Sequence, residues 1–325
     1  MARMKLLDEK IYEDVNEESI ELLNDYILEM RSLRKSEGTI YQYVADIKGF
    51  YCWVHTNAKN KSVLELKKRD FRKFFLYMDE NGASNARINR MQCSLRNMLT
   101  YAVSDDDIYD DYEINVMANI KGLQKESVRE ITFVTDAQIK TIIDYLLEKE
   151  RYREALYLSL SYDSAGRKNE IFQVNKEGFT TAKQTNEVIG KRAKRFPLLY
   201  FSRTREIAKL YLEQRGEDNE EALFVTGVGE SAKRASYDTL YAWSISFGKI
   251  LKELCDVSLV TNPHCWRHSC LENMSEGNHY ALNELGKDKL DIDILRVLAN
   301  HESIDTTKSY LKNDDSKLLN EAFGL

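Results

Sequence analysis

Residues 262–274 read NPHCWRHSCLENM and residues 297–310 read VLANHESIDTTKSY, and these two runs decide how the rest of the chain is interpreted. The span from 262 to 310 contains four of the five histidines. His264 lies three residues before Arg267 and four before His268, so on a helix the three side chains share one face. Pro263 suits the first turn of such a helix, because its missing N–H would have no helical partner there. The sequence therefore predicts a helix with a cationic face.

The second run adds His301 and Tyr310. Arginine, histidine and tyrosine together suit the attack of a phenol oxygen on a phosphodiester, since a guanidinium grips the non-bridging oxygens and a histidine orients the phosphate or carries protons. Zinc binding by His264 and His268 is the weaker alternative, because no Glu follows His264 as it does in a zinc-protease helix. Arg267 would also sit beside the cation. We predict no metal and no other cofactor.

These runs resemble the active-site boxes of the tyrosine recombinase (phage integrase) family, which read approximately H-x-x-R-H and L-G-H followed by T-x-x-Y. The first box of the family is an arginine followed by an acidic residue, and it resembles SAGRKNEI at 164–171. The family also carries a lysine on a β-hairpin between the boxes. That hairpin resembles VIGKRAKRFPL at 188–198.

The resemblance implies a role for each matching residue. It implies a nucleophile at Tyr310 that forms a 3′-phosphotyrosine, and a phosphate clamp made by Arg167 and Arg267. Lys191 would protonate the leaving oxygen, with Lys194 as the alternative lysine. The remaining roles are proton transfer and phosphate contact by His264 and His301, orientation of these groups by Glu170 and His268, and DNA contact by the hairpin cations Arg192, Lys194 and Arg195.

Two features depart from the family pattern. Asn300 precedes His301 where the family has glycine, and the segment 276–290 makes the stretch from Arg267 to His301 longer than the family norm. An insertion here separates two halves of the site, and a misplacement of about 1 Å costs roughly a hundredfold in rate. We expect the right residues to be present and leave open whether they react.

Composition indicates the cellular compartment in which we expect the protein. No apolar run in the 325 residues approaches membrane-spanning length, and the N-terminus has no hydrophobic signal region. The five cysteines are odd in number and contain no C-x-x-C pair, which favours reduced thiols over disulfides or zinc. We therefore expect a cytoplasmic protein without a membrane partner, encoded by a phage or its bacterial host and associated with the nucleoid.

The net charge of −6 argues by itself against a nucleic-acid partner, but the charge is unevenly distributed. Residues 11–30 contain seven acidic residues and no Lys or Arg, whereas residues 31–100 contain 14 Lys and Arg against six Asp and Glu. Further acidic residues gather between 105 and 113. A basic block between acidic ones is either a solvated helical surface or a polarised DNA footprint.

The first half of the chain also resembles the helical core-binding domain of the family, on TIYQY at 39–43 and ARINR at 86–90. Arg87, Arg90 and Arg96 fall on one predicted helix, near 84–103, from which arginines reach a DNA backbone or simply solvate the helix. We predict a mainly α protein with a small β-sheet, arranged as a two-domain DNA clamp. The predicted parts are a helical, SAM-like core-binding domain at 1–116, a linker at 117–132 and a catalytic-type domain at 133–325.

Two functions fit these residues. The first is a site-specific recombinase that cuts and rejoins double-stranded DNA during integration. The second is a catalytically silent DNA-binding repressor on the same fold, such as a prophage lysogeny regulator. An architectural protein that only bends DNA is less consistent, because it would not need Lys191 or Tyr310. Double-stranded DNA is the expected partner in each case, with a homo-oligomer possible on the DNA.

Overall fold

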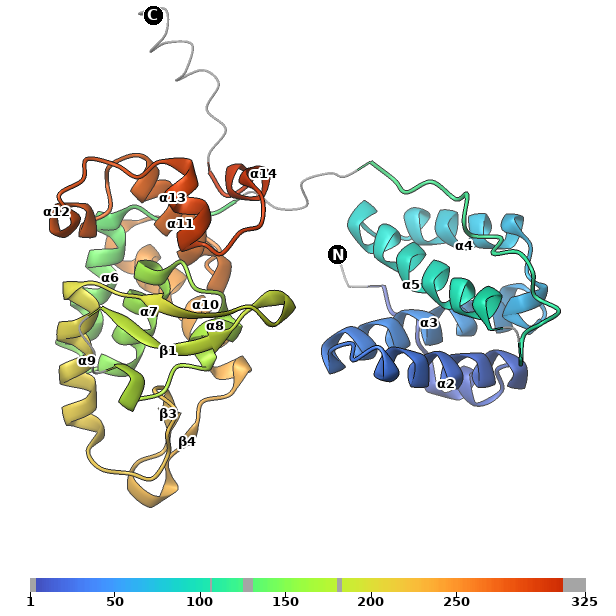
Figure 1. The fold of residues 1–325 in the computed structure, drawn as a ribbon, viewed down its shortest axis with the longest axis horizontal. Coiled ribbons are helices and arrows are strands. Elements are labelled where there is room, and N and C mark those ends of the chain that lie inside the picture. The colour runs from blue at the N-terminus through green and yellow to red at the C-terminus, as the bar shows by residue number, and fades with distance from the viewer. Residues whose placement is uncertain (1–3, 106, 125–130, 180–182, 312–325) are drawn as a thin grey trace, which may run out of the picture. The chain divides into compact units, whose positions relative to one another are not determined.

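A computed structural model describes residues 4–105, 107–124, 131–179 and 183–311 of the chain. The chain divides into two compact units, Met1–Glu130 and Ile131–Leu325, called here the N-terminal and C-terminal units. Most elements are helices, and the described residues form two separate two-stranded sheets (Figure 1). The predicted mainly α fold is confirmed. Within these ranges no helix has both the length and the apolar character needed to cross a bilayer.

The N-terminal unit is a helical bundle. Its elements are α1 (Glu9–Glu13), α2 (Glu17–Ser32), α3 (Glu37–Asn57), the 3-10 turn η1 (Val63–Glu65), α4 (Lys68–Glu80) and α5 (Asn85–Ser104). The three long helices α2, α3 and α5 begin after Asn16, Ser36 and Ser84, whose side chains accept hydrogen bonds from backbone N–H groups of the first turn. Phe50 of α3 packs on Phe71 and Phe74 of α4, with ring centroids 5.2 and 4.8 Å away.

Met117 and Ile120, which we predicted to lie in a linker, are buried in the core of the N-terminal unit. Arg96 fixes this segment, because its Nε donates to the Met117 carbonyl at 3.3 Å and its Nη2 to the Ile120 carbonyl at 2.8 Å. The polar composition of the segment conceals these two anchors. The boundary between the units falls between residues 130 and 131, inside the predicted 117–132 linker, while the start of that segment packs with the N-terminal unit.

The C-terminal unit contains helices and two hairpins. Its helices are α6 (Asp136–Glu148), α7 (Tyr152–Ser164), α8 (Lys168–Phe172), α9 (Ser202–Arg215), α10 (Tyr237–Cys255), α11 (Pro263–Ser275), α12 (Ala281–Leu285), α13 (Ile292–Leu298) and α14 (Ile304–Lys308). The strands are β1 (Gln184–Ile189), β2 (Arg195–Leu199), β3 (Val225–Thr226) and β4 (Lys233–Arg234), and the 3-10 turns are η2 (Glu177–Phe179), η3 (Lys191–Ala193) and η4 (Gly229–Ser231).

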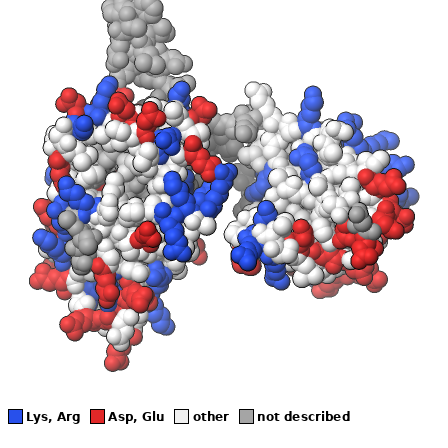
Figure 2. Space-filling view, in the orientation of Figure 1, with Lys and Arg blue, Asp and Glu red and all other residues white. Residues whose placement is uncertain are grey.

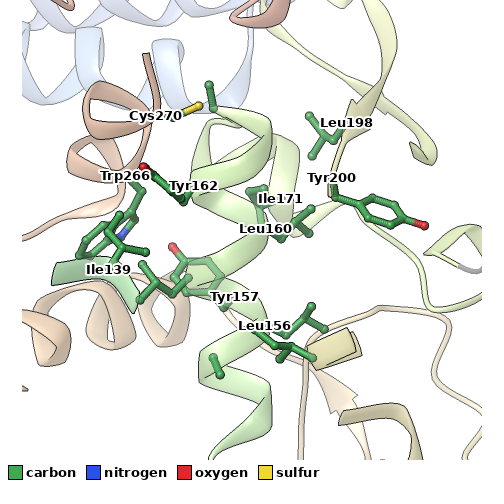
Figure 3. Packing of buried hydrophobic residues seen from close by; sticks show 14 of the residues in the cluster. Ile139, Leu156, Tyr157, Leu160, Tyr162, Ile171, Leu198, Tyr200, Trp266 and Cys270 are labelled. Carbon is green, nitrogen blue, oxygen red and sulfur yellow. The ribbon is translucent and has the colours of Figure 1, made fainter. Parts of the chain in front are cut away.

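Helix α7 is the centre of the C-terminal unit. Every residue from 155 to 164 is buried, so the helix contacts neighbours on all sides. Figure 3 shows Trp266 of α11 and Ile139 of α6 on one side of α7, and Ile171 of α8 and Leu198 of β2 on the other. The predicted helix with the H-x-x-R-H run, α11, thus packs with its apolar residues against the core helix and leaves its polar residues to the site.

Strands β1 and β2 form the hairpin that was predicted to carry the lysine. They pair antiparallel, with Val188 opposite Phe196 and Ile189 opposite Arg195. The turn between them is η3, in which Arg192 adopts a left-handed backbone with φ of 60°. A Cβ at Gly190 would lie 2.6 Å from the Phe196 ring, so the close packing of the hairpin requires glycine there.

Candidate active site

Arg267 is the centre of the site. Its side chain projects from α11 and is almost fully buried, with 1% of its surface exposed. Its Nη1 donates to the carbonyl of Ala165, and its Nη2 donates to the carbonyl of Ala299 and lies 2.8 Å from Nε2 of His301. Among the described residues its Nε has no hydrogen-bond partner and the guanidinium forms no ion pair. Arg267 is therefore a buried cation whose partners are all neutral.

Both carbonyls lie at the C-terminal ends of helices. Ala165 follows α7 and Ala299 follows α13, where the last carbonyls of a helix have no partner inside it and carry the negative end of the helix dipole. One guanidinium therefore caps two helices and holds their ends together. No sequence motif reports this role, because it uses backbone oxygens.

The structure also accounts for the missing glycine. Asn300 has a φ of 50°, in the left-handed region that glycine favours. Asparagine tolerates this region better than most residues, so it replaces glycine here while the chain turns from Ala299 to His301. The insertion does not separate the two halves of the site either, since His301 returns to hydrogen-bonding distance of Arg267.

His301 is held on both ring nitrogens. Its Nδ1 lies 3.0 Å from the hydroxyl of Thr307, and its Nε2 faces Arg267. Burial, followed by the positive charges of Arg267 and Arg167, lowers the pKa of His301 to about 3. Because a guanidinium can only donate, Nε2 must accept, and the ring proton lies on Nδ1. His301 is thus a neutral imidazole that orients Arg267.

The ring of Tyr310 lies against the same group of side chains. Its centroid is 4.2 Å from that of His268, on which it stacks, and 4.8 Å from that of His301. The guanidinium carbon of Arg267 is 5.3 Å from the Tyr310 centroid. His268 also lies with Nδ1 3.3 Å from the Tyr310 carbonyl oxygen, which fixes the backbone of the tyrosine. The structure therefore brings together Arg267, His268, His301 and Tyr310.

Arg167 enters the site from the N-cap position, immediately before α8. Glu170 accepts from the Arg167 backbone N–H at 2.7 Å and from its Nη1 at 2.9 Å, so the carboxylate fixes both the start of the helix and the side chain. Glu170 is buried and Arg167 is partly exposed. Burial and the charge of Arg167 lower the pKa of Arg267 to about 10. The two guanidiniums thus make an electropositive site, in which the Glu170 carboxylate offsets the charge of Arg167.

The predicted hairpin cations lie at the turn beside this cluster. Lys191, Arg192, Lys194 and Arg195 are all exposed. Arg192 forms an ion pair with Glu302, the residue after His301, so the turn contacts the loop that carries the histidine. His264 is exposed on α11, with its ring centroid 6.4 Å from that of His268. Lys191 and His264 therefore flank the cluster rather than belong to its buried part.

The three predicted arginines of α5 have partners inside the N-terminal unit. Arg87 donates to the Met4 carbonyl, Arg90 binds the Asp46 carboxylate with two hydrogen bonds of 2.9 Å, and Arg96 holds the 117–120 segment. Their contact with DNA stays a prediction. Figure 2 shows acidic side chains along the α2 edge of this unit and basic ones over α4, which carries Lys68, Arg69, Arg72 and Lys73. The predicted uneven charge is thus a feature of the folded surface.

The fold and this cluster define a protein of the tyrosine recombinase class. The chain belongs to the phage integrase family, whose family model matches residues 132–317. That match begins at the start of the C-terminal unit and includes every residue of the cluster. The resemblance proposed from the sequence boxes is confirmed.

Curated relatives and solved structures agree with this assignment. The chain is 28% identical over 330 residues to the SPbeta prophage-derived recombinase-like protein YomM of Bacillus subtilis, with 97% of this chain and 93% of the relative covered. It is 22% identical over 292 residues to tyrosine recombinase XerD of Oceanobacillus iheyensis, covering 85% of this chain and 87% of the relative.

Two solved structures show the same fold at low identity. A lambda integrase dimer bound to a COC′ core site matches with a TM-score of 0.66 and 12% identity, over 89% of this chain and 76% of that one. XerH site-specific recombinase bound to palindromic difH substrate matches with a TM-score of 0.65 and 16% identity, over 92% and 82%.

Proposed function

We propose that the protein binds double-stranded DNA and that the electropositive cluster grips one backbone phosphate. The observation that carries this proposal is the environment of Arg267, a buried guanidinium that has only neutral partners among the described residues and lies near Arg167. A buried cation is costly without a counter-charge. A phosphodiester supplies that counter-charge and two oxygens that suit guanidinium donors.

We further propose that Tyr310 cuts the DNA. Its phenol oxygen forms a bond to phosphorus while the bond from phosphorus to the 5′-oxygen breaks, which leaves a 3′-phosphotyrosine. His264 is accessible to take the phenol proton, and Lys191 gives a proton to the leaving 5′-oxygen. Because the new ester retains the phosphodiester bond energy, the reverse reaction rejoins a strand without a cofactor. The packing of Tyr310 against Arg267, His268 and His301 supports this role.

Covalent capture tests the cutting step. The purified full-length protein is incubated with nicked duplexes that carry its own target site, selected beforehand from a random library, so that the cut strand end diffuses away. We expect a protein–DNA adduct that resists denaturing gel electrophoresis. Tyr310→Phe should abolish the adduct, whereas Tyr41→Phe, at an exposed position of α3, should leave it unchanged. An adduct that persists in Tyr310→Phe would refute the assignment of the nucleophile.

A silent DNA-binding repressor is the second candidate, and one observation favours it. The donors with which Arg267 would stabilise the reacting phosphate during cutting are partly committed to Ala165, Ala299 and His301. In this case the selected site is bound equally by the wild-type protein and by Tyr310→Phe, and neither forms an adduct.

The exposed cations of the hairpin turn are the proposed DNA contacts of the C-terminal unit. Lys194→Ala and Arg195→Ala should each weaken binding about equally for all sequences and reduce its dependence on salt.

The α5 arginine Arg90 differs, because its partner is Asp46. Arg90→Ala should therefore lower the stability of the N-terminal unit as well as any DNA affinity. Equal thermal stability of Arg90→Ala and the wild type would contradict this internal role.

We also propose that copies of the protein assemble on DNA, as the lambda integrase dimer and tetramer do in their solved complexes. An apolar groove lined by Phe196, Leu198, Leu290, Ile294 and Val297 offers a surface for such contacts. Val297 is 62% exposed, which is unusual for an apolar residue in a groove. Val297→Glu should preserve binding of one copy and prevent assembly of further copies, as measured by analytical ultracentrifugation with DNA. Unchanged assembly would exclude this groove.

A further inference from the structure

The segment between α11 and α13, which makes this chain longer than the family pattern, is folded into the C-terminal unit. His279, Ala281 and Leu282 are buried, and the Leu290 N–H donates to the Met274 carbonyl at 2.9 Å. The segment therefore has a fixed place in the unit. Its most specific contact is made by Tyr280, immediately before α12.

Tyr280 donates its hydroxyl to a fully buried carboxylate. The oxygen lies 2.9 and 2.8 Å from the two carboxylate oxygens of Asp163, whose side chain is 0% exposed. The backbone N–H of Phe201 and the hydroxyl of Thr204 also donate to Asp163, at 3.0 and 2.6 Å. No salt bridge to Asp163 is found among the described residues. These neutral donors are what stabilise the carboxylate, and the loss of one leaves a buried charge poorly solvated.

The ring of Tyr280 is held separately from its hydroxyl. The guanidinium carbon of Arg203 lies 3.7 Å from the ring centroid, and Arg203 is itself paired with Asp136 at 3.3 Å. Phenylalanine at position 280 would keep this stacking. The substitution Tyr280→Phe therefore removes the hydrogen bond to Asp163 and little else.

Asp163 stands at the end of the central helix, two residues before Ala165. Ala165 has a left-handed backbone, with φ of 48°, which is strained for a non-glycine residue. Such a turn persists only where its surroundings hold it, and the carbonyl of this turn accepts from Arg267. The side chain of Asp163 anchors the helix end from which the turn departs.

We infer that Tyr280 is a positioning residue for Arg267. Its hydroxyl fixes Asp163, Asp163 fixes the last turn of α7, and the Ala165 carbonyl then holds the guanidinium in place. The inserted segment thus supports the site indirectly, through Tyr280 and Asp163. The DNA-binding test of this inference rests on the proposed function, in which Arg267 contacts a phosphate.

The test compares Tyr280→Phe with Tyr157→Phe in the full-length protein. Tyr157 is the control, because it is buried on α7, the helix that carries Asp163, and its hydroxyl bonds only to neutral hydroxyl groups among the described residues, those of Ser244 at 3.1 Å and of Ser161. The affinity for a fluorescein-labelled duplex of mixed sequence is measured by anisotropy. We expect Tyr280→Phe to weaken binding about tenfold, the effect of one hydrogen bond to a charged group, and Tyr157→Phe to change it less than about twofold.

A double-mutant cycle separates positioning from general destabilisation. In an Arg267→Lys background, Tyr280→Phe should weaken binding by less than about twofold, because the group that it positions is gone. An equal effect of Tyr280→Phe in both backgrounds would overturn the inference. So would equal affinities of Tyr280→Phe and the wild type.

A second measurement does not depend on DNA. The Gly166 and Arg167 amides donate to Ser164 and Glu170 and report on the turn after α7. We expect Tyr280→Phe, but not Tyr157→Phe, to accelerate hydrogen exchange at these amides about tenfold. If the wild type binds no DNA, the proposed function fails and exchange alone decides the inference. Unchanged exchange rates at both amides would then refute it.

Discussion

Replacing Arg267 by lysine tests whether this residue holds the fold of the C-terminal unit as well as the site. The substitution conserves charge and changes the geometry of the donors. The guanidinium reaches the carbonyls of Ala165 and Ala299 and the ring of His301 at the same time. A lysine ammonium is a single point and cannot span these three acceptors.

The expected loss follows from the acceptors that are left unpaired. With at least two of them buried and unsatisfied, each costing about 1–3 kcal/mol, Arg267→Lys should lower the free energy of unfolding of the C-terminal unit by about 4 kcal/mol. Arg192→Lys is the control, since its ion pair with Glu302 is exposed on both sides. An exposed pair contributes less than about 1 kcal/mol.

Urea unfolding monitored by tryptophan fluorescence measures this loss. Trp53 is the tryptophan of the N-terminal unit, and Trp243 and Trp266 belong to the C-terminal unit. In a Trp53→Phe background the signal therefore reports the C-terminal unit alone. A loss below about 1 kcal/mol for Arg267→Lys would refute the view that this guanidinium caps two helices.

Three further predictions follow from the backbone and the buried ionisable groups. Ala165→Gly should raise the stability of the C-terminal unit by about 0.5–1 kcal/mol, because the left-handed φ of 48° strains alanine. Ala155→Gly, inside α7, is the control and should lower the stability. The reverse order of the two urea midpoints would contradict this prediction. Asn300→Gly should be neutral within about 0.5 kcal/mol and Asn300→Val should cost about 2 kcal/mol, as thermal melts can establish, and equal melting of the two variants would exclude a required left-handed turn. Burial lowers the pKa of both His279 and His301 to about 3, helped by the charge of Arg203 near His279 and of Arg267 near His301. Below about pH 6.5 the unfolded state therefore binds more protons than the folded state, and stability falls as the pH falls. Burial raises the pKa of Asp163 to about 6, so between about pH 4 and 6 the folded state binds the extra proton at Asp163 and this group acts in the opposite direction. Asp163→Asn should therefore steepen the acid loss in urea unfolding at pH 4–6, and an unchanged slope would be incompatible with a raised pKa.

Local patterns carried most of the fold prediction. The residues TDAQ at 135–138 are typical of a capping box at a helix start, and α6 begins there with both hydrogen bonds of the box present. Glycine is common just after a helix and proline in the first turn of one; Gly82 accordingly follows the end of α4, and Pro263 begins α11. Each of these signals involves residues that are close together in the chain, so it can be recognised in a single sequence.

The parts that the sequence does not reveal are long-range or use the backbone. Ala165 and Ala299 act through carbonyl oxygens, and no side-chain pattern records them. The arginines of α5 have the composition of a DNA-facing helix, but Arg87 and Arg90 have internal partners, Met4 and Asp46, that lie more than 40 residues away. The Tyr280–Asp163 contact joins residues 117 positions apart and was hidden in a segment that looked only like an insertion.

The two helix ends capped by Arg267 bear on how such a protein can change over evolutionary time. On the roles proposed above, mutations of Tyr310 or Lys191 remove chemistry and leave the domain folded, whereas a mutation of Arg267 also lowers the stability of the domain. Descendants that stopped cutting DNA would therefore lose the tyrosine or the lysine first and keep the arginine for as long as they kept the fold. The presence of the arginine in a relative of this chain is consequently weak evidence of activity, and the presence or absence of the tyrosine is stronger evidence.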